Sequence, residues 1–134
     1  MFENLVIENG ENIMGGGIAI IDATPTFINC TIRNNTAGNQ GGGIWSVGDA
    51  SSPSPLFRDC KIHGNVAYVG GGLAILTRTV EFENCQVFDN TAADGPGIFI
   101  GENALASLTG TTVCGNTNTL DLPGEVLQIA GNHE

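Results

Sequence analysis

A block of about 26 residues recurs along this chain, and no other feature restricts the possible folds as strongly. The run Gly15-Gly16-Gly17-Ile18 returns at residues 41–44 and 70–73, and again, with Pro96 inside it, at residues 95–98. A second block, residues 25–37, aligns without gaps to residues 55–67 and 80–92, with weaker copies at residues 2–10 and 108–116. Five copies in register predict a solenoid in which each coil rests on the next.

Each copy contains three short β-type runs separated by turn residues, such as residues 18–21, 26–28 and 30–32. The period also suits a leucine-rich horseshoe, but leucine is sparse here and no 3.6-residue periodicity is present. We therefore predict an all-β parallel β-helix of about five coils with three short parallel sheets, forming one domain over residues 1–134. The predicted repeats are 1–24, 25–54, 55–79, 80–103 and 104–118; residues 119–134 are expected to form a C-terminal cap and residues 48–54 a surface loop.

Equivalent positions of successive coils touch in such a stack, so each column of the alignment predicts a row of contacts. The large apolar columns are expected to point inward: Phe2, Phe27, Phe57, Phe82 and Leu108, and Ile18, Ile44, Leu73 and Ile98. Cys30, Cys60 and Cys85 share an inward column and are expected to be free thiols, because parallel in-register neighbours do not face one another. Cys114 falls in an outward column with Glu8, Arg33, His63 and Phe88.

Two turn columns explain why the chain has 20 glycines and 14 asparagines. One column holds Asn4, Asn29, Asp59, Asn84 and Gly110, and the other holds Gly10, Asn35, Asn65, Asn90 and Asn116. Exchange among Asn, Asp and Gly is typical of a left-handed backbone position, so we expect positive φ in both columns. Stacked asparagines also hydrogen-bond along their column, which predicts a ladder.

The pairing of the Gly-Gly-x-Ile run with tetrads such as Ile32-Arg33-Asn34-Asn35 resembles the repeats of polymorphic outer membrane proteins, which are chlamydial, and of other large bacterial surface proteins. Those repeats usually begin the tetrad with Phe, where this chain has Ile or Val. The resemblance covers roughly residues 2–118 and implies a right-handed parallel β-helix. It also implies a structural or adhesive module of a secreted or surface-exposed protein, although no signal peptide is expected in this chain.

The charge of −10, from 4 basic and 14 acidic residues, argues against nucleic-acid binding. No apolar stretch is long enough for a transmembrane helix. We expect no catalytic residues, no metal site and no cofactor, since aligned acidic residues such as Asp22, Asp49 and Glu102 fit solvated loops.

The outward columns of the first strand of each coil are unusually apolar. They place Ile21, Trp45, Val47, Leu76 and Phe99 on one sheet face, where a monomer would expose a large patch. This pattern predicts self-association through that face, aided by an N-terminal coil that presents unpaired strand edges to a second copy or to a neighbouring β-helix segment.

The alternative hypothesis is a polysaccharide-binding module, or a degenerate relative of polysaccharide lyases or hydrolases. Its candidate face comprises Arg33, Arg58, Lys61 and His63. The simpler interpretation of these residues is ion pairing between coils, Arg33 with Glu8 and Arg58 with Glu83.

Overall fold

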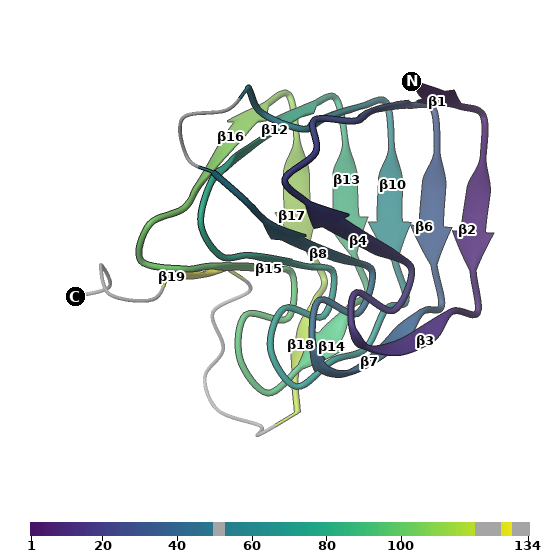
Figure 1. Cartoon of the computed structure of the whole chain (residues 1–134). Helices are drawn as coiled ribbons and strands as arrows, with labels where there is room; N and C mark the ends of the chain where they lie inside the picture. Colours follow the sequence, from purple (N-terminus) through teal and green to yellow (C-terminus); the bar gives the residue numbers. More distant parts are fainter. Residues whose placement is uncertain (50–52, 120–126, 130–134) are drawn as a thin grey trace.

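Residues 1–49, 53–119 and the backbone of residues 127–129 are described by the computed structural model, and these residues form strands and turns without any helix. Three parallel five-stranded sheets run along the stack (Figure 1). Sheet 1 comprises β1 (Phe2–Glu3), β5 (Thr26–Ile28), β9 (Leu56–Arg58), β12 (Thr79–Glu83) and β16 (Leu105–Thr109). Sheet 2 comprises β2 (Val6–Glu8), β6 (Thr31–Arg33), β10 (Lys61–His63), β13 (Gln86–Phe88) and β17 (Thr112–Cys114). Sheet 3 comprises β4 (Ile18–Ile21), β8 (Ile44–Val47), β11 (Leu73–Ile75), β15 (Ile98–Ile100) and β19 (Leu127–Ile129).

The strand register confirms the columns predicted from the repeat. Phe2 pairs with Phe27, Phe27 with Phe57, Phe57 with Phe82 and Phe82 with Leu108, which makes four complete turns before the fifth coil. The four phenylalanine rings stack at centroid separations of 5.0, 4.9 and 5.5 Å. This parallel β-helix is therefore built around continuous side-chain rows, each coil supplying one member.

The cysteine column is buried and unoxidised. Cys30, Cys60 and Cys85 are each 1% exposed and free, and Cys114 is free and exposed, as predicted. The thiols of Cys60 and Cys85 donate hydrogen bonds to the backbone carbonyls of Phe27 and Phe57 in the preceding coil, at 3.4 and 3.2 Å. Each buried thiol thus has an acceptor one coil below it.

The Gly-Gly-Gly run packs coils together at the entry to sheet 3. Gly41 has a φ of 70°, a left-handed conformation that a side chain disfavours. A Cβ atom on Gly42 would lie 2.4 Å from the carbonyl oxygen of Gly71 in the next coil. The recurrent glycines are therefore required by the close contact of neighbouring backbones.

The two asparagine columns differ, which corrects half of the turn prediction. Asn4, Asn29, Asp59, Asn84 and Gly110 have φ values of 54–58°, as predicted. In the second case the left-handed residue comes one position earlier, at Asn9, Asn34, Gly64, Asp89 and Gly115. The expectation of positive φ at Asn35, Asn65 and Asn90 is wrong, because these side chains turn inward and are 0% exposed.

The inward asparagines form the predicted ladder. Asn65 Nδ2 donates to Asn90 Oδ1 at 2.9 Å and to the Ile32 carbonyl at 3.1 Å, while Asn65 Oδ1 accepts the backbone N–H of Asn35 at 3.0 Å. The same pattern carries on to Asn116, and Gly10 donates its N–H to Asn35 at the other end. Buried amide groups at a chain turn thereby satisfy one another.

A fourth short ladder, which the sequence did not predict, runs beside these asparagines. It comprises β3 (Glu11–Met14), β7 (Thr36–Gln40), β14 (Thr91–Ala92) and β18 (Thr117–Asn118), joined through bridges at Val66. At the far end, β19 pairs with β15, so the backbone of residues 127–129 continues sheet 3. The rest of the predicted cap, and residues 50–52 of the predicted surface loop, lie outside the described residues.

Candidate functional site

The outer face of sheet 3 carries the apolar side chains that the sequence singled out. The register places Ala19, Trp45, Ala74 and Phe99 in one row, and Ile21 beside Val47. Ile21 is 58% exposed, Trp45, Val47, Leu76 and Phe99 are half-buried, and Ala74 between the two aromatic residues is buried. Trp45 Nε1 donates to Gln40 Oε1 at 3.0 Å, which fixes the indole against the neighbouring turn. We call this row the apolar face; its role as an interface stays a prediction.

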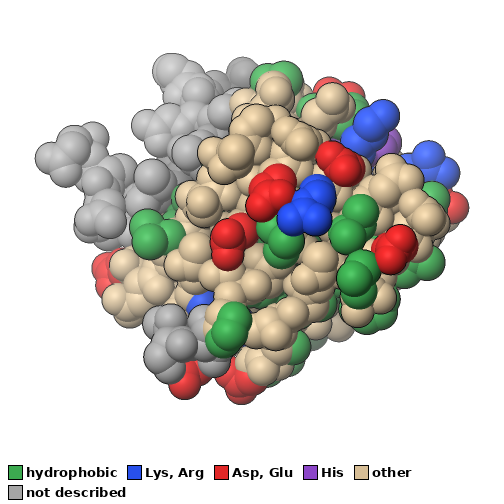
Figure 2. All heavy atoms as spheres, turned by 90° about the horizontal axis from the view of Figure 1, so that it is seen from above, with side chains coloured by type: hydrophobic (Ala, Val, Ile, Leu, Met, Phe, Trp, Pro, Cys, Tyr) green, Lys and Arg blue, Asp and Glu red, His purple; other side chains and the backbone are tan. Residues whose placement is uncertain are grey.

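The basic residues of the alternative hypothesis divide between two sheets. Arg33, Lys61 and His63 lie on sheet 2, whereas Arg58 ends strand β9 of sheet 1. Arg33 Nε bonds Glu8 Oε1 at 2.7 Å and Arg58 Nε bonds Glu83 Oε1 at 2.8 Å, with all four side chains about two-fifths exposed. Figure 2 shows basic side chains beside acidic ones on the face seen from above. The predicted ion pairs between coils are therefore present, each contributing up to about 1 kcal/mol.

His63 contributes an aromatic surface next to these charges. Its ring stacks on Phe88 of the next coil with centroids 4.6 Å apart and planes 6° from parallel. Partial burial lowers the pKa of His63, and the positive charges of Arg33 and Lys61 lower it further, while Asp89 opposes them. The shared column of His63 and Phe88 was visible in the sequence, but the predicted glycan face did not include Phe88.

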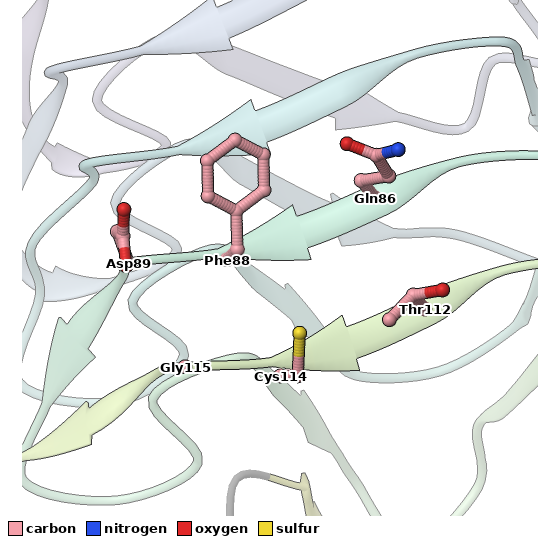
Figure 3. Close-up of a pocket in the computed structure, with 6 residues that line it drawn as sticks. All are labelled: Gln86, Phe88, Asp89, Thr112, Cys114 and Gly115. Atoms are coloured by element: carbon pink, nitrogen blue, oxygen red, sulfur yellow. The ribbon is translucent and has the colours of Figure 1, made fainter.

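A hollow of about 410 Å³ opens beside this stack on sheet 2. It is lined by Gln86, Phe88, Asp89, Thr112, Cys114 and Gly115. In Figure 3 the Phe88 ring from β13 and the Cys114 sulfur from β17 rise on the same side of the sheet. An aromatic ring surrounded by amide, hydroxyl and carboxylate groups suits a flat polar ligand. The sequence placed Phe88 and Cys114 outward but did not predict a hollow between their strands.

A family model for the right handed beta helix region matches residues 1–125. The chain belongs to the right-handed β-helix family. No curated protein and no solved structure matches the chain. This β-helix family contains both enzymes and non-catalytic proteins, so membership establishes the fold, and function has to be argued from the surfaces.

The described part of this β-helix contains no helix long and apolar enough to span a membrane. Within the same residues, no group of three or more His, Cys, Asp or Glu side chains is arranged to hold a metal ion. The chemistry available on the described surface is therefore that of the apolar face, the charged rows and the sheet 2 hollow.

Proposed function

We propose that this β-helix is a non-catalytic structural or adhesive module that self-associates through the apolar face of sheet 3. The observation that carries the proposal is the absence of charge among the described outward residues of sheet 3 in a chain of net charge −10. Sheets 1 and 2 carry Glu81, Glu83, Glu8 and their basic partners outward. Two strongly acidic chains approach most easily through the one face that carries neither sign of charge.

The first coil offers a second surface in this proposal. Phe2, Leu5, Val6 and Ile13 are 46, 41, 55 and 65% exposed. A hollow of about 230 Å³ there is lined by Phe2, Ile18, Ala19, Ile20, Ala23, Pro25 and Phe27. Strand edges with adjacent apolar side chains favour stacking of a further coil, supplied by a second copy or by a neighbouring β-helix segment. A secreted or cell-surface location of a bacterial protein, implied by the resemblance of the repeats, belongs to the same proposal.

The test is the solution mass of the chain, 13.8 kDa per copy, by light scattering. Trp45→Asp places a charge in the apolar face and is expected to give a monomer, with circular dichroism checking that the fold is kept. Phe88→Asp is the matched control, since Phe88 is a half-buried aromatic residue on sheet 2, and it is expected to leave the oligomer intact. A monomeric wild type, or equal effects of the two substitutions, would contradict the proposal.

Polysaccharide binding at sheet 2 is the second candidate, favoured by the hollow beside the His63–Phe88 stack. A sugar ring would lie on Phe88, with Gln86, Asp89 and Thr112 as hydrogen-bonding groups and Lys61 attracting an acidic sugar. Glycan-array binding that Phe88→Ala abolishes and Trp45→Ala preserves would support this candidate. Loss of binding with Trp45→Ala alone would assign the glycan to the apolar face instead.

A further inference from the structure

Arg78 is the one described cation that does not lie on an outer face. Its side chain is 1% exposed and is among the largest fully buried side chains, whereas Arg33, Arg58 and Lys61 reach solvent. A guanidinium group stays protonated inside a protein, so the fold keeps a positive charge out of water at this position. Burial of an uncompensated charge is costly, which makes the surroundings of Arg78 informative.

Arg78 lies between β11 and β12, directly beneath the insert at residues 48–54. Thr77 Oγ1 accepts the N–H of Gly48 and donates to the Gly48 carbonyl, both at 2.8 Å. Arg78 Nη2 donates to the carbonyl of Pro53 at 2.5 Å. Thr77 and Arg78 therefore fasten both ends of the insert to the next coil.

The remaining donors of the guanidinium point to a bound group. Nε and Nη1 have no hydrogen-bond partner among the described residues. The Nη1 side is packed against the insert, because a Cβ atom on Gly48 would lie 2.6 Å from Nη1 and 3.2 Å from Cδ. The Nε–H and Nη2–H groups share the opposite edge, and this fork is the geometry with which arginine binds anions.

We propose that the Nε edge of Arg78 binds one small monovalent inorganic anion of chloride size beneath the insert. Such an anion accepts from Nε and Nη2 and neutralises the buried charge, which a water molecule does not. The bound anion would hold the insert in place, since Nη2 also holds Pro53. The site is independent of the apolar face and of the sheet 2 hollow, so its test does not depend on the proposed function.

Bromide is the probe. In crystals of the wild-type chain grown or soaked in sodium bromide, we expect an anomalous peak beside Arg78 Nε. In solution, bromide at constant ionic strength is expected to raise the thermal midpoint saturably. Because the net charge of −10 disfavours anions at the surface, a saturable rise reports an interior site.

Two variants separate this site from general salt effects. Arg78→Met is expected to lose the bromide-dependent shift, and Arg58→Met, which removes an exposed arginine, is expected to keep it. A water molecule or no density beside Nε in the bromide crystal overturns the proposal, as does a shift that persists in Arg78→Met. If Arg78→Met does not fold, the wild-type anomalous map decides the question by itself; surface peaks only mean an adventitious ion and refute the site.

Discussion

At the scale of single residues, this β-helix uses asparagine for two different purposes. Asn29 is exposed and has a φ of 54°, so its value lies in tolerating a left-handed backbone. Asn65 is fully buried, and its amide group holds three neighbours: Asn90, Ile32 and Asn35. The same residue type thus serves conformation in one column and hydrogen bonding in the other.

Replacement of these two asparagines should separate the roles. Asn65→Ala leaves the N–H of Asn35 and the carbonyl of Ile32 without partners in the interior, so we expect a loss of about 3 kcal/mol or more in the free energy of unfolding. Asn29→Gly keeps the left-handed backbone and removes an exposed contact with Asn4, so a change within about 0.5 kcal/mol is expected. Denaturant unfolding measures both, and equal losses would contradict the distinction.

His63 makes the stability depend on pH in a direction that follows from its pKa. Partial burial, with help from Arg33, lowers the folded-state pKa below the ordinary value of 6.5. The unfolded chain therefore takes up the proton first as the pH falls, so this contribution is fully present above 6.5 and is lost below it. His63→Phe keeps a flat ring against Phe88 and removes the titration.

We expect the wild type to lose more stability than His63→Phe between about pH 7.5 and about pH 5, because the carboxylates titrate alike in both proteins. Urea unfolding at the two pH values gives the comparison. Parallel losses in the two proteins would show that His63 binds its proton equally well in the folded and unfolded chains.

At the scale of elements, the spacing of coils depends on positions that accept no side chain. An alanine Cβ at position 42 would lie 2.4 Å from the Gly71 oxygen and 2.6 Å from the Val66 oxygen, both backbone atoms. Gly42→Ala must therefore move a coil, and we expect a loss of about 2 kcal/mol or more in the free energy of unfolding. Gly38→Ala is the control in β7, where the nearest atom is 3.9 Å away, and it should be tolerated. Thermal or denaturant unfolding that ranks the two equally would contradict this packing argument.

The repeat predicted the elements well because stacked coils convert sequence alignment directly into contacts. Phe57 and Cys60 could be placed inside from their columns alone, and both are buried. The second asparagine column was misassigned by one residue, since Asn is suitable both for positive φ and for a buried ladder. Arg78 was missed because it lies between strands, where no inward–outward alternation applies, and the sheet 2 hollow was missed because depth is not a property of one column.

At the scale of the whole molecule, charge is distributed around an uncharged face. Asp22, Asp49 and Glu102 are exposed and follow β4, β8 and β15 at the end of sheet 3. The apolar face itself is neutral, so its burial is favourable while the acidic rims and the net charge of −10 on each copy repel. Association through this face therefore opposes two effects that respond differently to salt.

Added sodium chloride should strengthen the self-association. Screening shortens the reach of the repulsion from roughly 30 Å at 0.01 M salt to roughly 8 Å at 0.15 M, whereas apolar burial is little affected, so we expect Kd to fall several-fold over this range. Sedimentation velocity measures Kd at each concentration. The double variant Asp22→Asn, Glu102→Gln removes rim charge and is expected to associate more tightly at low salt and to show a shallower salt dependence. A Kd that rises with salt would mean that ion pairs hold the copies together, and would transfer the interface to the charged rows of Arg33, Arg58 and Lys61.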